Sequence, residues 1–163
     1  MKSNRRRACA LAGSMGRNDV DEVLGGEIPQ VEFVMLAEYV EVIHGKLYVM
    51  GGAWETITVG NFDVPVTLSL AVSVAVPWLG TNRQHVVTIS VETGDGAVLA
   101  EQSRTVMVGR PASIEPGTSQ RRLIATQMPV QLPGPDRYVV VAAVEGAPRA
   151  RTAFQAAGGH IHG

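Results

Sequence analysis

Hydrophobic and polar positions alternate most strictly between Val66 and Val76. In this stretch, VTLSLAVSVAV, every even-numbered residue is valine or leucine, and every odd-numbered residue is threonine, serine or alanine. A period of two predicts a β-strand with one apolar face, because a helix would scatter the same side chains around its surface. The second face is small and uncharged, so we expect it to be partly covered.

Segments of the same kind recur from residue 31 to residue 157. Val87, Ile89 and Val91 share one face of the next strand, and the Asp95-Gly96 pair that follows is a strong hairpin signal. No amphipathic helix of ten residues interrupts the pattern. Seven to nine short strands are therefore predicted, at 31–43, 46–50, 56–59, 66–76, 85–92, 98–109, 121–132, 137–144 and 148–156.

Local irregularities and glycines refine these strands. Leu99 and Met107 disagree in parity with Val106 and Val108, which a β-bulge near Ser103 would reconcile. A proline donates no ladder hydrogen bond, so the PV dipeptide at 129–130 predicts that its strand ends on a sheet edge. The strands 31–43 and 46–50 flank a two-residue His-Gly turn of the primed type, and two glycines at 51–52 allow a sharp bend after them.

Regular short strands with glycine and proline turns predict an all-β protein. We expect an antiparallel two-sheet β-sandwich of immunoglobulin-like or Greek-key type, in one domain spanning residues 31–157. Residues 1–30 have little pattern and are predicted to form a disordered N-terminal segment; residues 158–163 form a flexible tail. Because the pattern begins near residue 31, Met15 and Met35 are both possible initiators, and we expect the functional start to lie downstream of Met1.

Composition excludes some classes of function. The net charge is −1 and only 18% of the 163 residues are charged, so no overall field attracts nucleic acid or an anionic membrane. A single cysteine, Cys9, permits neither an intramolecular disulfide nor a thiolate metal cluster. No stretch is long and apolar enough to span a bilayer. We therefore expect a soluble, cytoplasmic protein.

Four segments, 37–57, 76–96, 108–117 and 133–146, together resemble an uncharacterised family of small bacterial proteins of unknown function. The resemblance covers roughly residues 35–154. It implies a β-sandwich that begins close to Met35, but no activity, cofactor or catalytic residue. The last of these segments, PGPDRYVVVAAVEG, also looks like the final hairpin of many immunoglobulin-like modules.

Aromatic residues are candidate contacts for a partner or ligand. Trp54 follows the paired glycines, where it could stack on a sugar or anchor a partner; we favour a structural role between the sheets. Trp78 lies in the loop after strand 66–76, and both interpretations stay open because loop aromatics are frequent contact residues. Tyr39 and Tyr48 flank the first turn and are expected to pack across strands. Tyr39 is kept as a candidate contact.

The four histidines form no recognisable metal site. His44 lies in a tight turn, where we expect a solvated side chain and a candidate contact. His160 and His162 form an H-x-H pair, but a zinc site needs three or four fixed ligands. Neither a G-x-S-x-G elbow nor a G-x-x-x-x-G-K-[ST] loop is present. We expect no metal, no cofactor and no enzymatic activity.

Arginines supply the last candidates. If the final hairpin paired with strand 121–130, Arg121 would line one sheet face together with Arg137, Arg149 and Arg151. Such a stripe could bind a polyanion, although a solvated strand face is the usual alternative.

We therefore predict a non-enzymatic interaction or structural module that binds a protein partner or itself. Self-association is expected from the low charge, the small uncharged face of Val66–Val76 and poorly protected edge strands. The alternative is a small-ligand-binding, carbohydrate-binding or weakly enzymatic sandwich with its site at the Trp78 loop end.

Overall fold

The computed structural model describes residues 28–145 and 149–159, and these fold into nine strands and one turn of 3-10 helix. The order along the chain is β1 (Gln30–Ile43), β2 (Lys46–Gly52), β3 (Thr56–Val59), β4 (Val66–Val76), η1 (Trp78–Gly80), β5 (Gln84–Thr93), β6 (Val98–Met107), β7 (Gln120–Val130), β8 (Arg137–Val144) and β9 (Ala150–Gly158). The predicted strands are confirmed.

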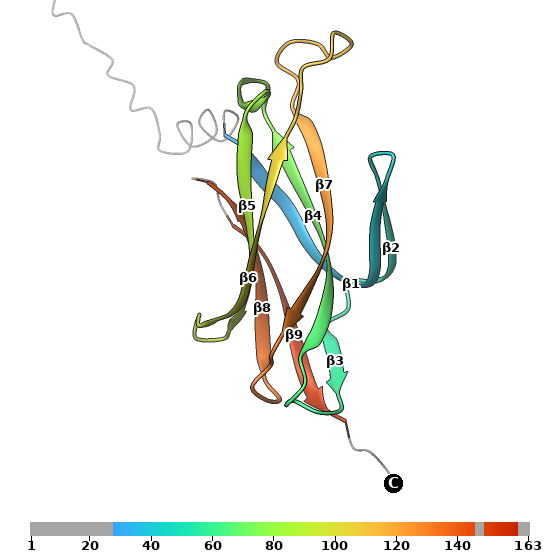
Figure 1. Ribbon diagram of the computed structural model, residues 1–163, viewed down its shortest axis with the longest axis vertical. Coiled ribbons are helices and arrows are strands. Elements are labelled where there is room, and N and C mark those ends of the chain that lie inside the picture. Colours follow the sequence, from blue (N-terminus) through green and yellow to red (C-terminus); the bar gives the residue numbers. More distant parts are fainter. Residues whose placement is uncertain (1–27, 146–148, 160–163) are drawn as a thin grey trace, which may run out of the picture.

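The strands form two sheets that pack face to face (Figure 1). Sheet A has the order β2-β1-β4-β7, and sheet B has the order β3-β9-β8-β5-β6. Every described pairing is antiparallel except that of β3 with β9. The predicted two-sheet sandwich is thus confirmed, with β7 on a sheet edge as Pro129 indicates.

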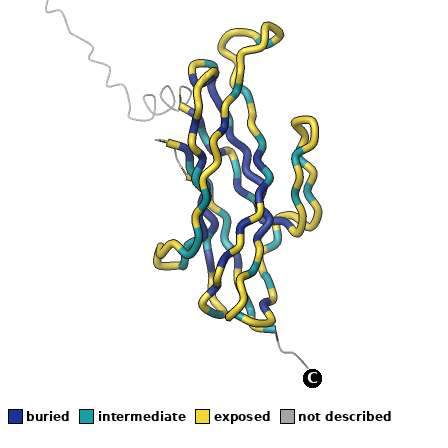
Figure 2. Tube along the Cα trace, viewed as in Figure 1, coloured by how far each residue is buried: buried dark blue, intermediate teal, exposed yellow. Residues whose placement is uncertain are grey.

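The core lies between the sheets and follows the period of two. The even-numbered side chains of β4 from Leu68 to Val76 are completely buried. They face Val87, Ile89 and Val91 of β5, which are equally buried, and side chains of β8 and β9 complete the layer. Figure 2 shows this buried interior running along the body of the molecule.

The second face of β4 is also covered, as its small, uncharged residues predict. Ser69, Ala71 and Ser73 are buried, although they point away from the core. The Ser69 hydroxyl donates a hydrogen bond to the Glu38 carbonyl oxygen (3.2 Å), and the Ser73 hydroxyl donates to Glu32 (2.5 Å). The two serines therefore tie β4 to both ends of its pairing with β1.

β1 belongs to two different environments. It pairs with β4 only between Gln30 and Ala37, and from residue 38 onward it pairs with β2 alone. Residues 38–50 consequently form a two-stranded ribbon, here called the arm. It stands beside the rest of the two-sheet sandwich, here called the body (Figure 1). His44 and Gly45 turn its tip with φ angles of 49° and 72°, as the predicted primed turn requires.

The predicted β-bulge near Ser103 in β6 is wrong. The register of β6 with β5 is continuous from Ala100 to Met107, so no bulge occurs near Ser103; the register shifts instead around Leu99. Polar side chains consequently face inward: Gln102 and Arg104 both donate hydrogen bonds to the Thr126 hydroxyl of β7, at 3.1 and 3.0 Å. Polar contacts between β6 and β7 thus join sheet B to sheet A along the edge where these two strands lie.

The final hairpin also departs from expectation. β8 and β9 lie in sheet B, whereas β7, which carries Arg121, lies in sheet A. The conditional stripe of Arg121 with Arg137, Arg149 and Arg151 is therefore wrong, because these arginines belong to different sheets. The alternation pattern does not identify a strand's partner.

Both predicted tails, apart from residues 28–30 and 158–159, lie outside the described residues, as do Gly146 and the H-x-H pair. Among the residues described, no helix has the length and apolar character needed to cross a bilayer.

We expect Tyr138→Phe to lower the free energy of unfolding by about 1 kcal/mol, because it removes one buried hydrogen bond while keeping the ring. The Tyr138 hydroxyl donates to the Gly134 carbonyl oxygen at 2.6 Å, and its ring packs 5.6 Å from that of Phe154. Urea denaturation of both proteins measures the difference. An unchanged stability would show that this bond does not hold the β7–β8 loop.

Candidate functional site

The outer face of the arm gathers large apolar side chains at the surface. The register places Tyr39 opposite Met50 and Glu41 opposite Tyr48. Tyr39 and Tyr48 are about half exposed, and Met50 is 67% exposed. Ile43, on the same face near the tip, is exposed as well. Scattered surface apolar residues are common, but a continuous group on one ribbon indicates a contact surface.

At the base of the arm, side chains pack directly against the backbone of two glycines. Gly51 has a φ of +56°, and a Cβ on it would lie 2.8 Å from the Glu38 side chain. A Cβ on Gly52 would lie 2.6 Å from Val49 and 3.2 Å from the Met35 sulfur. Other residues would be strained at these two positions. β2 continues through both glycines, and the predicted bend falls one residue later, at Ala53.

The tip and outer face hold two of the predicted contact residues. His44 is exposed in the turn. The Tyr39 hydroxyl donates a hydrogen bond of 2.9 Å to Glu41, and this bond, together with the negative charge of Glu41, raises the pKa of Tyr39. At neutral pH the outer face therefore presents a neutral phenol beside a carboxylate.

The inner face of the arm and strand β7 enclose a groove of about 680 Å³. Val40 and Val42 line its arm side, and Leu123 and Ile124 line its β7 side. Arg104, Arg121 and Arg122 also line the groove, so it combines apolar walls with basic groups.

Arg121, another predicted contact residue, is engaged by Glu32. Its Nε and Nη2 atoms donate to the two Glu32 carboxylate oxygens at 2.5 and 2.7 Å, and Ser73 donates to the same carboxylate. The hydrogen bonds from Arg121 and Ser73 lower the pKa of Glu32 from 4.5 to about 2. The pair spans β4 and links β1 to β7 on the outer face of sheet A.

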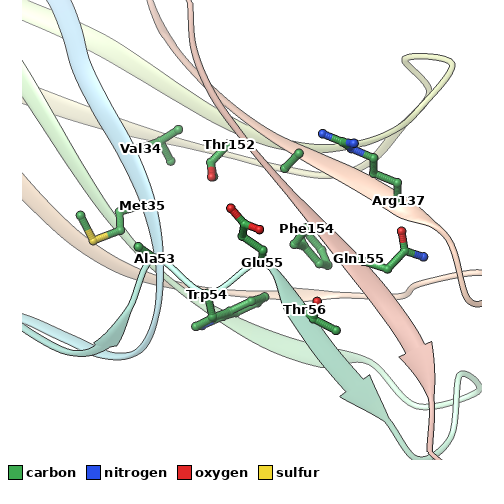
Figure 3. Close-up of a pocket in the computed structure, with 11 residues that line it drawn as sticks. Val34, Met35, Ala53, Trp54, Glu55, Thr56, Arg137, Thr152, Phe154 and Gln155 are labelled. Carbon is green, nitrogen blue, oxygen red and sulfur yellow. The ribbon is translucent and has the colours of Figure 1, made fainter.

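A second hollow, the Trp54 cleft, lies where the linker between β2 and β3 crosses from sheet A to sheet B. Its volume is about 560 Å³, and Figure 3 shows its lining side chains. Trp54 is half-buried at the margin of the core, where its ring meets that of Phe154 at 79° with 5.7 Å between centroids. Arg137 also lines this cleft, from β8.

Trp78 lies at the opposite end of the sandwich, in the loop between β4 and β5. Its carbonyl oxygen accepts a hydrogen bond of 2.7 Å from Arg110 Nη2, and the Arg110 guanidinium carbon stands 4.7 Å from the centroid of its ring. Arg110 Nε also donates to the Thr81 hydroxyl, which in turn donates to the Trp78 carbonyl. Arg110 thereby fixes this loop.

The six predicted contact residues thus lie in different places. Tyr39 and His44 are on the arm, Arg121 is in the groove, Trp54 and Arg137 share the cleft, and Trp78 is at the far loop end. Sequence reasoning missed three residues at these places: Met50, Glu55 and Thr152. The parity of Met50 with Tyr48 was the available signal. In the part of the chain that the structure describes, no three His, Cys, Asp or Glu side chains group as a metal site.

The Glu32–Arg121 pair makes stability depend on pH in a defined direction. A carboxyl with a lower pKa in the folded chain stabilises it above the unfolded pKa, here near 4.5, and loses this contribution as the pH falls toward 2. We expect Glu32→Gln to cost about 1 kcal/mol at neutral pH, because solvent screens this surface pair. Urea denaturation should show the difference largely gone by about pH 2.5. Glu41→Gln is the control, and a pH-independent difference for Glu32→Gln would contradict the assignment.

The contacts that Arg110 makes with Trp78 and Thr81 can be tested by removing the Arg110 side chain. We expect Arg110→Ala to shift the Trp78 emission to longer wavelength and to lower stability by about 1–2 kcal/mol, since a cation–π contact and hydrogen bonds are lost. Emission is measured in a Trp54→Phe background, so that Trp78 alone reports. Arg83→Ala is the control, because Arg83 lies in the same loop as Trp78, and it should leave the emission spectrum unchanged. An equal shift in both variants would show that Arg110 does not hold Trp78 in place.

Comparisons with known proteins give a family but no activity. No curated protein matches the chain. Among solved structures, the crystal structure of the C-terminal domain of Wzt is similar, with 11% sequence identity over 82% of this chain and 75% of that chain, at a TM-score of 0.46. The model of a family of unknown function, DUF6941, matches residues 32–157. Because this match spans most of the sequence, the chain belongs to the DUF6941 family.

Proposed function

We propose that this protein is a non-enzymatic interaction module that self-associates through its arm. The observation that carries the proposal is the pairing of residues 38–43 with β2 alone, with large apolar side chains exposed on the outer face. The occupant we assign to this surface is a second copy of the chain.

The energetics of a two-stranded ribbon support a partner. An isolated hairpin is at best marginally stable in water, and a third strand or a packed face is normally needed. The inner face of the arm has β7 beside it across the groove, but its outer face is open. A neighbouring strand along the edge of β2 would lie beside Tyr48 and Met50 and remove part of their apolar surface from water. Burial of apolar surface is the main driving force of association.

The edge of β2 favours a second copy over an unrelated partner. Three other described edge strands carry features that discourage pairing: Pro129 in β7, the register shift around Leu99 in β6, and the four-residue length of β3. Between its tip and Gly51, β2 carries one charged residue, Lys46. Two identical antiparallel edges complement each other about a two-fold axis, so two copies of sheet A would join into one continuous sheet.

The chemistry of the outer face suits such a contact. Tyrosine and methionine are enriched in the centres of protein interfaces. The same face carries one carboxylate, Glu41, and one ammonium group, Lys46. Two copies therefore meet without an excess of like charge.

Two finer assignments accompany this proposal. The hydrogen bond from the Tyr138 hydroxyl back to Gly134 resembles the tyrosine corner of immunoglobulin-like sandwiches, which supports an immunoglobulin-like class. A single cysteine, which permits no intramolecular disulfide, supports a reducing compartment such as the cytoplasm, and the resemblance to small bacterial proteins supports a bacterial source. A ligand site at the Trp78 loop end has less support, because Arg110 stands over the Trp78 ring.

Light scattering after size exclusion tests the proposal. We expect a monomer–dimer equilibrium in which Met50→Lys raises the dissociation constant at least about tenfold, because a lysine ammonium would be desolvated in the contact. Met107→Lys is the matched control: Met107 is 59% exposed, close to the 67% of Met50, but it lies on β6.

Two results would contradict self-association through the arm. One is a monomer at every accessible concentration of the unmodified protein. The other is an equal loss of dimer in the Met107→Lys control, which would place the contact elsewhere or make it a general effect of added charge.

A further inference from the structure

We propose that the Trp54 cleft binds a neutral sugar ring. This site is separate from the outer face of the arm and is independent of self-association. Its walls come from both sheets: Val34 from β1, Thr152 and Gln155 from β9, and Trp54 and Glu55 from the linker between β2 and β3. The volume of about 560 Å³ falls within the range of small-ligand sites.

The aromatic wall of the cleft is held rigidly. Ala53 N donates to the Leu36 carbonyl oxygen in sheet A at 2.8 Å, and Gln155 N donates to the Glu55 carbonyl oxygen in sheet B at 2.8 Å. Trp54 lies between these two bonds, and its ring packs against Phe154. Ala53 also has a φ of 60°, a costly conformation for alanine that the neighbouring bonds maintain. An aromatic ring fixed before binding loses little conformational entropy on contact with a ligand.

The polar groups of the cleft are free to bind. Among the described residues, none forms a side-chain hydrogen bond or ion pair with the Glu55 carboxylate, the Thr152 hydroxyl or the Arg137 guanidinium. In Figure 3 the Glu55 carboxylate stands above the Trp54 ring and Thr152 lies beyond it, so both lie near the same space. Gln155 adds a side-chain amide, whose Nε2 donates a long hydrogen bond of 3.4 Å to the Ala156 carbonyl oxygen.

The backbone of β9 adds further partners. β3 pairs with β9 only from Gln155 onward, so the edge of β9 before this residue has no neighbouring strand. Gln155 N points toward β3, as its bond to Glu55 shows. By the alternation of a strand, the N–H and C=O groups of Ala153 point to the same side, into the cleft that Ala153 lines.

This combination selects the class of ligand. Carboxylate, guanidinium and amide groups are planar and bind pairs of adjacent hydroxyls, while an indole ring packs against the C–H face of a sugar. The charges of Glu55 and Arg137 balance, so the cleft favours a neutral ligand over a phosphate or a cation. One carboxylate without a second acidic neighbour also provides too few ligands for a metal.

Fluorescence titration of the full chain tests the site. In a Trp78→Phe background, Trp54 alone reports, and D-glucose, D-galactose, D-mannose and N-acetylglucosamine serve as separate probes. We expect at least one to give a saturable change with a midpoint on the order of 1 mM, as befits a shallow site. Glu55→Gln and Thr152→Val should each raise that midpoint about fivefold, the effect of one lost hydrogen bond. Glu101→Gln, which alters an exposed carboxylate of β6, should not.

Three results would overturn the assignment: no saturable change with any of the four sugars up to about 50 mM, tighter binding of glucuronic acid or glucose 6-phosphate, or a midpoint unaffected by both cleft variants. Circular dichroism verifies that these variants are folded. Glu55 is exposed and Thr152 is only half-buried, so the fold should persist. Met50→Lys should leave sugar binding unchanged, which separates this site from the arm.

Discussion

The pairing of β1 is the constraint on which the rest of the structure depends. Its first half lies against β4, a central strand buried on both faces, and its second half has only β2 as a neighbour. The change occurs at Ala37, which pairs with Ser69 on one side and with Gly52 on the other. Body and arm are therefore parts of one continuous strand, and the arm is fixed at its base although its outer face is uncovered.

The return of the chain from the arm creates the second candidate site. After β2 the linker must leave sheet A and reach β9 in sheet B, and it does so through the backbone bonds of Ala53 and Glu55. Trp54 is held at the crossing, where it closes the interior and also lines an open cleft. The structural and contact interpretations of Trp54 are thus compatible. Its inner atoms pack on the core, while the cleft receives the rest.

The sequence alone predicted most of the fold but little of the candidate sites. A period of two identifies strands and buried faces because it follows from strand geometry, and β4 was predicted residue for residue. The same period says nothing about partners, so the sheet that holds β8 and β9 was not predictable. Alternation placed the bulge of β6 at the wrong residue because Gln102 and Arg104 are polar yet face inward to reach Thr126. Met50 reads as an ordinary strand residue in the sequence, and only the structure shows that it lies on the open outer face of the arm.

Hydrogen exchange measured at several protein concentrations tests the account most directly. The experiment determines whether the free edge of β2 gains a neighbouring strand from a second copy of the chain. The account predicts that amides of β4 are protected at every concentration, whereas amides on the free edge of β2, between Lys46 and Met50, gain protection as the concentration rises. Strong protection of these β2 amides in dilute solution, unchanged on concentration, would contradict it.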